Sequence, residues 1–159
     1  MRVFRSASVL GILSVAFASS VLSMSAEART VNATAGIAGT NTVASCFTVS
    51  FITGTAGVTN SCAAAATYAI PLIVDVAGVR TVLVTGKAET GGSLVCQVFT
   101  YTFNGNLVTS TASQTWTPGG GYQQKAFSSV NVPAGGTGYV YCSLSGSNRA
   151  RVNVIDYAP

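Results

Sequence analysis

Short runs rich in β-branched and aromatic residues, separated by turn-forming residues, constrain the fold of this chain most. In residues 68–76 the apolar side chains alternate onto one face, which is the period of a half-buried strand. Helical periodicity appears nowhere over a length that could form a stable helix. The pattern predicts about nine strands, near 45–52, 57–62, 68–76, 79–86, 93–103, 106–116, 122–132, 138–144 and 149–157.

The turn signals indicate how some of these strands are connected. Asn104-Gly105 suits a type I′ turn, which requires positive φ at both positions, and would pair 94–103 with 106–116. A second hairpin is expected between 68–76 and 79–86. About nine short strands without helices predict an all-β fold, a single two-sheet antiparallel β-sandwich of the Greek-key or jelly-roll kind.

The N-terminus has the order of a secretory signal peptide. Arg2 and Arg5 precede an apolar run over 9–21, and Ala26-Glu27-Ala28 is an A-x-A cleavage site. The apolar run is too short and too rich in serine for a membrane span. Residues 1–28 are therefore predicted to be the signal and residues 29–159 a single domain, secreted or periplasmic, without a transmembrane segment.

All four cysteines follow the predicted signal, where thiols are normally oxidised in pairs. Cys46 and Cys62 lie symmetrically about Gly54, inside a turn-like segment, so a hairpin would set them opposite each other. This favours Cys46–Cys62 and leaves Cys96–Cys142 as the second disulfide. The count alone also permits two crossed pairings, for which the sequence gives no local reason.

The composition of residues 29–159 excludes several kinds of site. Histidine is absent, which removes Ser-His-Asp and Cys-His catalysis and His-containing zinc sites. Three carboxylates are too few for a typical calcium cage, so no metal and no cofactor are expected. The net charge of this part is +3, much less than the basic density of nucleic-acid-binding proteins.

The remaining candidates for catalysis are few. A serine could pair with Lys87 or Lys125, or two of three carboxylates could act as acid and base. Those carboxylates are Asp75, Glu89 and Asp156, and the first two would flank the 68–76/79–86 hairpin. Solvated surface charges are the commoner explanation, so we predict a non-enzymatic protein without catalytic residues.

Trp116 and Tyr122 flank a glycine-rich turn and have two interpretations. The pair could form an exposed platform on which sugar rings stack, as a candidate ligand site. Alternatively, Trp116 is a core anchor at the end of a strand, which we favour because aromatic residues dominate core burial in small domains.

A second aromatic set combines Tyr139, Tyr141 and Tyr157 with Arg149 and Arg151. Alternation would place Arg149, Arg151 and Asn153 on one strand face as a small basic stripe. The stripe is too sparse for nucleic acid, and we interpret its arginines as solvent-facing.

The C-terminal half resembles a loose group of small exported bacterial proteins, each a disulfide-bonded β-sandwich of unknown function. The resemblance rests on Cys96–Tyr101, the Asn104-Gly105 turn, Tyr139–Leu144 and Val152–Tyr157. It implies fold and export only. The chain is also distantly similar in kind to chaperone–usher pilins and spore-coat-U-like domains, although it has four cysteines and no clear donor strand in residues 29–44.

These observations favour an exported, non-enzymatic protein with a structural or binding role at the cell envelope or outside the cell. The alternatives are a carbohydrate-binding module that uses Trp116 and Tyr122, or a pilin-like subunit with residues 29–44 as donor. A glycan or another envelope protein is the expected partner. We expect a monomer whose fold survives deletion of residues 29–40.

Overall fold

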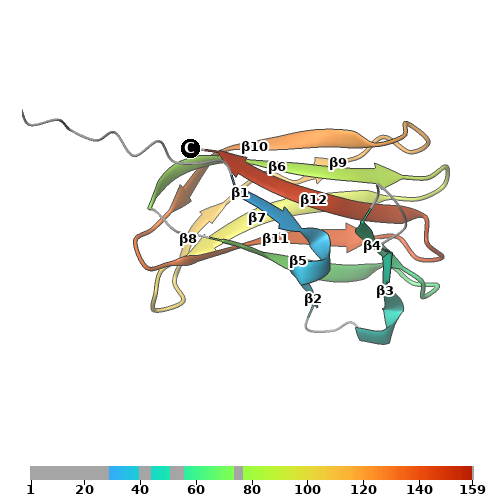
Figure 1. The fold of residues 1–159 in the computed structure, drawn as a ribbon, viewed down its shortest axis with the longest axis horizontal. Helices are drawn as coiled ribbons and strands as arrows, with labels where there is room; N and C mark the ends of the chain where they lie inside the picture. Colours follow the sequence, from blue (N-terminus) through green and yellow to red (C-terminus); the bar gives the residue numbers. More distant parts are fainter. Residues whose placement is uncertain (1–28, 40–43, 51–55, 74–76, 159) are drawn as a thin grey trace, which may run out of the picture.

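The computed structural model describes residues 29–39, 44–50, 56–73 and 77–158. Two antiparallel sheets pack face to face, so the predicted β-sandwich is confirmed. Figure 1 shows the two layers, with β10, β6 and β12 in one and β7, β11 and β5 in the other.

We call the first layer sheet A, in the order β10-β6-β12-β4-β3 with β1 also paired to β12. Its strands are β1 (Arg29–Asn32), β3 (Phe47–Ser50), β4 (Gly57–Asn60), β6 (Gly78–Ala88), β10 (Gln123–Val132) and β12 (Ala150–Ala158).

Sheet B has the order β2-β5-β11-β7-β8, with β9 also paired to β7. Its strands are β2 (Ile37–Ala38), β5 (Ala66–Leu72), β7 (Leu94–Tyr101), β8 (Leu107–Ser110), β9 (Gln114–Thr115) and β11 (Thr137–Leu144). Two short 3-10 turns, η1 (Ala33–Ala35) and η2 (Ala44–Cys46), complete the described elements.

The core lies between the sheets and follows from alternation along the strands. In β7 and β11 every second residue is buried, so one face of each strand points into the sandwich. From sheet A the central strands β6 and β12 contribute Val82, Val84, Val152 and Ile155. The inner faces therefore meet as one continuous apolar cluster.

Both predicted disulfides are formed, and no cysteine of the described chain is free. Cys46–Cys62 closes the β3–β4 hairpin, with its Cα atoms 5.0 Å apart. Cys96 and Cys142 face each other directly across β7 and β11, with Cα atoms 4.1 Å apart. The second bond lies fully inside the core.

The turn between β7 and β8 forms where predicted but is not of type I′. Gly105 has a φ of +81°, whereas Asn104 is not in the left-handed region. The Gly105 N–H donates to the Thr102 carbonyl at 2.9 Å, and the Thr102 N–H donates to the Asn106 carbonyl at 2.8 Å. This is a three-residue loop, which needs only one residue with positive φ.

The predicted hairpin between 68–76 and 79–86 is wrong. β5 lies between β2 and β11 in sheet B, while β6 lies between β10 and β12 in sheet A. The chain therefore crosses from one sheet to the other after β5, through a connection that includes residues outside the described part. Ile70 and Leu72 are buried as alternation predicts, while Val74 and Val76 lie outside the described residues. Alternation does not specify in which sheet a buried face lies.

Residues 29–38 are built into both sheets, which argues against the expectation that the fold survives deletion of residues 29–40. β1 pairs with β12, and β2 pairs with β5. Val31 and Ala33 are buried in the core, with η1 between the two strands. The donor segment of the pilin-like alternative is thus interrupted by η1, and its described strands pair within the chain.

Within the described residues, no helix is long and apolar enough to cross a membrane.

Candidate functional sites

Trp116 is a core residue, as the favoured interpretation predicted. Its side chain is fully buried, and its indole Nε1–H donates to the Gln123 carbonyl at 2.9 Å. Tyr122 is 46% exposed. The two rings therefore do not form a common exposed platform, because the glycine-rich turn directs one inward and leaves the other on the surface.

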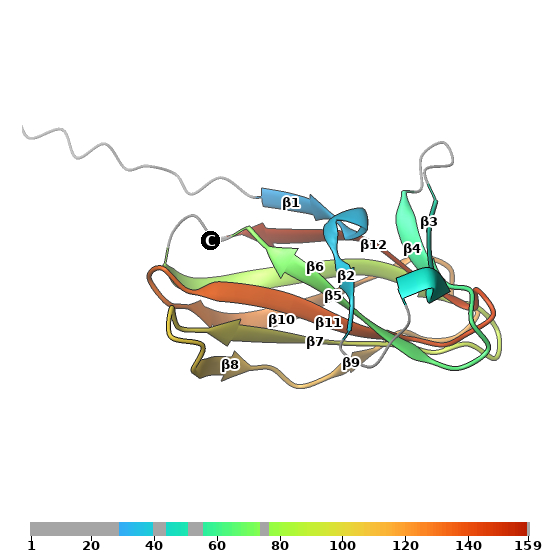
Figure 2. The same cartoon turned by 90° about the horizontal axis from the view of Figure 1, so that it is seen from below.

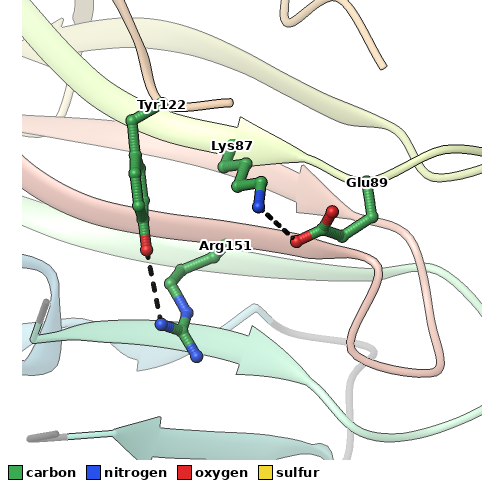
Figure 3. Close-up of polar contacts among 4 residues, drawn as sticks. All are labelled: Lys87, Glu89, Tyr122 and Arg151. Carbon is green, nitrogen blue, oxygen red and sulfur yellow. Dashed lines mark hydrogen bonds and ion pairs between the residues drawn. The ribbon is translucent and has the colours of Figure 1, made fainter. Parts of the chain in front are cut away.

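Tyr122 instead borders a small polar pocket on sheet A. The pocket has a volume of about 150 Å³ and is lined by side chains from β6, β12 and the turns around them, namely Lys87, Glu89, Tyr122, Asn148, Ala150 and Arg151. Figure 3 shows four of these side chains converging from different segments of the chain. We call this the Tyr122 pocket.

Charges in the Tyr122 pocket are unevenly paired. Lys87 Nζ forms an ion pair with a Glu89 carboxylate oxygen at 2.8 Å, and also lies 5.9 Å from the centre of the Tyr122 ring. Arg151 donates to the Tyr122 hydroxyl at 3.4 Å (Figure 3), and no carboxylate of the described chain forms an ion pair with it. The pocket therefore holds one paired and one unpaired cation.

A second site lies on the outer face of sheet B. Four half-buried aromatic side chains lie side by side there, two from β7 and two from β11, and we call them the tyrosine face: Phe99, Tyr101, Tyr139 and Tyr141. Figure 2 views the molecule from the side of this sheet.

The antiparallel register explains how the four rings meet. Tyr139 is opposite Phe99, so the diagonal neighbours are Phe99 with Tyr141 and Tyr101 with Tyr139. The ring centres of these pairs are 5.3 and 6.4 Å apart with steep interplanar angles, and Tyr139 and Tyr141 are 6.0 Å apart. Edge-to-face contacts of this kind keep the rings as one contiguous surface.

Sheet B carries no charge, since none of the residues in its six described strands is acidic or basic. Burial of the Tyr141 hydroxyl raises its pKa, and the neighbouring Tyr101 and Tyr139 raise it further, because their ionised forms would repel a second anion. The face is therefore neutral at physiological pH.

The predicted grouping of the remaining tyrosines and arginines is not formed. Tyr139 and Tyr141 lie on sheet B, whereas Tyr157 is buried in β12 of sheet A. Arg149 precedes β12, and Asn153 is buried at a register shift between Val152 and Val154. The expected face of Arg149, Arg151 and Asn153 fails because a β-bulge breaks the alternation.

The candidate acid–base pairs do not converge in the described structure. Glu89 is paired with Lys87, and Asp156 accepts a hydrogen bond from Thr30 at 2.6 Å in β1. Asp75, with its expected approach to Glu89, lies outside the described residues. Among the described residues, no three acidic, histidine or cysteine side chains are grouped to hold a metal.

Sequence reasoning singled out Tyr122, Tyr139 and Tyr141 but missed Phe99 and Tyr101 as their neighbours. The signal was present as aromatic residues at alternate positions in each of two runs, 99/101 and 139/141. What the sequence alone did not specify is that β7 and β11 are adjacent.

No protein-family model matches the sequence, and no curated protein sequence matches it either. Solved structures with a similar fold include the CBM36-1 domain of a multidomain xylanase from the hindgut metagenome of Trinervitermes trinervoides. It is 10% identical with a TM-score of 0.57, and the match covers 84% of this chain and 98% of that one.

A family 35 carbohydrate-binding module from Clostridium thermocellum is 13% identical with a TM-score of 0.55, covering 83% of this chain and 98% of that one. The carbohydrate-binding module CBM36 in complex with calcium and xylotriose is 15% identical with a TM-score of 0.53. This match covers 82% of this chain and 99% of that one. The chain spans only 27% of the Podospora anserina GH26-CBM35 β-(1,4)-mannanase, which also matches. At these identities the likeness is one of fold.

Proposed function

We propose that this chain is an exported, non-catalytic glycan-binding β-sandwich whose tyrosine face binds neutral polysaccharide. The observation that carries this proposal is the contiguous four-ring surface on a sheet without charged residues. The proposal keeps the general role expected from the sequence, but moves the binding surface from Trp116 and Tyr122 to sheet B.

The chemistry of the tyrosine face supports a sugar ligand. A pyranose ring has apolar C–H faces and a hydroxyl rim, so it suits a surface that offers both aromatic rings and hydrogen-bonding groups. Tyrosine provides a large apolar face and a hydroxyl that both donates and accepts. A neutral sheet imposes no cost of desolvating charge when an uncharged ligand covers it.

The fold likeness to carbohydrate-binding modules supports the same proposal. Two disulfides and a predicted signal over residues 1–28 support export of the mature domain 29–159. If export follows this route, the N-terminal residue of the protein recovered outside the cytoplasm should be Arg29, which N-terminal sequencing would determine.

Affinity electrophoresis of the oxidised 29–159 chain in gels containing xylan, mannan or laminarin tests the binding surface. We expect retardation by at least one polysaccharide, and a loss of about tenfold or more in affinity for the double variant Tyr139→Ala/Tyr141→Ala, because two stacking surfaces are removed.

Tyr122→Ala is the matched control, since it removes an exposed tyrosine ring from the other sheet and should leave retardation unchanged. Absence of binding to every polysaccharide, or equal loss in the control, would contradict the proposal. Unfolding curves of the variants separate loss of binding from loss of the fold.

A further inference from the structure

We propose that the Tyr122 pocket is a second, independent binding site, which takes the carboxylate of an acidic sugar such as a uronate. It differs from the tyrosine face in sheet, charge and size, and does not depend on it. The basis of this site is a pair of cations that the fold places next to each other.

Arg151 in β12 is directly opposite Lys87 in β6 in the antiparallel register. Like charges at directly opposed positions destabilise a sheet unless another group offsets them. Glu89 offsets only one of the two, because its carboxylate is 2.8 Å from Lys87 Nζ. The guanidinium of Arg151 is left with the neutral Tyr122 hydroxyl at 3.4 Å.

The neighbouring groups add donors for an anionic oxygen. Tyr122 accepts from Arg151 through its oxygen, which leaves the hydroxyl hydrogen free for donation. Asn148 is held in a turn with a φ of +58°, and its Oδ1 accepts from Thr59 Oγ1 at 3.0 Å. That bond leaves the Asn148 amide hydrogens for a ligand, so Tyr122 and Asn148 add donors to those of the two cations.

The charge balance favours a ligand with one negative charge. Two cations and one carboxylate give the pocket a net charge of +1, which one carboxylate would neutralise. A phosphate with nearly two charges would leave the pocket with a net charge of about −1. Arginine binds carboxylates through paired N–H groups, which are the strongest hydrogen bonds available here.

The size of the pocket and its rim indicate a sugar rather than a free anion. A volume of about 150 Å³ equals the liquid volume of about five waters, more than a carboxylate alone requires. The half-exposed Tyr122 ring borders the space, and Glu89 can accept a hydrogen bond from a sugar hydroxyl. A terminal uronate ring matches this combination of apolar edge, hydroxyls and carboxylate.

The test is an NMR titration of the oxidised 29–159 chain with D-glucuronate, with D-glucose and acetate as matched probes. We expect glucuronate to shift signals of the Tyr122 pocket with at least about tenfold higher affinity than either probe. Arg151→Gln should weaken glucuronate binding about tenfold or more, while Arg151→Lys should retain part of it.

Glu89→Gln should change the affinity for glucuronate in the opposite direction. This substitution releases Lys87 from its ion pair, so we expect affinity for glucuronate to rise about threefold. Glu89 is on the surface, so the variant should fold normally. Tyr139→Ala/Tyr141→Ala should bind glucuronate like the unsubstituted chain, which separates this site from the proposed polysaccharide surface.

Three results would overturn the proposal. Glucose binding as tightly as glucuronate would show that charge is not recognised, and acetate binding as tightly would show a non-specific anion site. Unchanged glucuronate binding in both Arg151→Gln and Glu89→Gln would place the ligand elsewhere.

Discussion

At the scale of single residues, Trp116 and Tyr122 illustrate how burial decides the role of an aromatic side chain. Trp116 fills the core and uses its polar edge to donate to the Gln123 carbonyl. Tyr122 lies beyond the glycine-rich turn and contacts two cations. Their position beside a glycine-rich turn identified both residues as candidates, but only the packing of the turn shows which one a ligand can reach.

Trp116→Ala should therefore destabilise the protein by about 3–5 kcal/mol, because it leaves a large cavity in the core and removes the indole N–H that donates to the Gln123 carbonyl. Urea denaturation measures the change. Tyr122→Ala is the control and should cost less than about 1 kcal/mol, since its ring is on the surface. A small loss for Trp116→Ala would contradict the core assignment.

Tyr141 should make the stability of the protein decline at alkaline pH. Burial, and then Tyr101 and Tyr139, raise its pKa above the ordinary value of 10.0 in the folded state. Because the folded state favours the protonated Tyr141 hydroxyl, this hydroxyl contributes to stability fully below pH 10.0. The contribution is lost as the pH rises through the folded pKa. Melting temperatures measured across this range should fall less steeply in Tyr141→Phe; an identical decline in the variant would contradict the assignment.

At the scale of secondary-structure elements, the two disulfides close loops of different length. The sequence separations are 16 residues for Cys46–Cys62 and 46 for Cys96–Cys142. Loop entropy predicts a stabilisation of about 3 kcal/mol for the first and about 4 kcal/mol for the second.

We therefore expect Cys96→Ala/Cys142→Ala to lower the free energy of unfolding more than Cys46→Ala/Cys62→Ala does. Full burial of the 96–142 bond adds a cavity cost in the same direction. Equilibrium denaturation of the two double variants gives the order, and the reverse order would show that strain outweighs loop length.

Deletion of residues 29–38 should destabilise the domain and promote association, contrary to the expectation from sequence. It removes the buried Val31 and Ala33 and uncovers part of one edge of β12. It also removes the Gly36 carbonyl that accepts from the buried Tyr68 hydroxyl at 2.7 Å. Unpaired strand edges recruit strands from other chains.

Size-exclusion chromatography and thermal melting of full-length and truncated mature protein measure both effects. Two point variants within the segment provide the matched comparison. Val31→Asp should destabilise strongly, because its side chain is 4% exposed, whereas Ile37→Asp at 65% exposure should have little effect. A truncated chain that stays monomeric and equally stable would restore the earlier expectation.

Local sequence patterns predicted the positions of most strands well, but they predicted poorly which strands pair with each other. Runs of β-branched and aromatic residues between turn signals located β6, β7, β10, β11 and β12 to within a few residues, because such runs are typical of strands. The short strands β1 and β2 were missed, and the single strand expected over 106–116 is divided into β8 and β9. Strands this short carry little pattern of their own, and their pairing is set by neighbouring strands. The Tyr122 pocket was also not predictable, because Lys87 and Arg151 meet only through the pairing of β6 with β12.

At the scale of the whole molecule, charge is divided between the two sheets. Every charged residue that lies in a described strand belongs to sheet A, and sheet B has none. The same sandwich therefore presents a charged side and a neutral aromatic side. Two ligands of different chemistry could bind these sides without competing for a surface.

This division predicts opposite responses to salt. Raising NaCl from about 0.1 M to about 1 M shortens the Debye length from about 10 Å to about 3 Å. Binding of neutral polysaccharide to the tyrosine face should be unchanged or slightly tighter, because it involves no charge. Binding of glucuronate should weaken severalfold, because Arg151 is partly exposed and its attraction is screened.

Parallel titrations of one protein preparation with a polysaccharide that binds and with glucuronate make the comparison, so that any effect of salt on the fold is common to both. Tyr122→Phe is a further control, since it keeps the ring but removes the hydroxyl beside Arg151, and should alter only the glucuronate titration. Equal salt dependence of the two ligands would mean that they share a site, and the assignment of charge recognition to one sheet and aromatic contact to the other would fail.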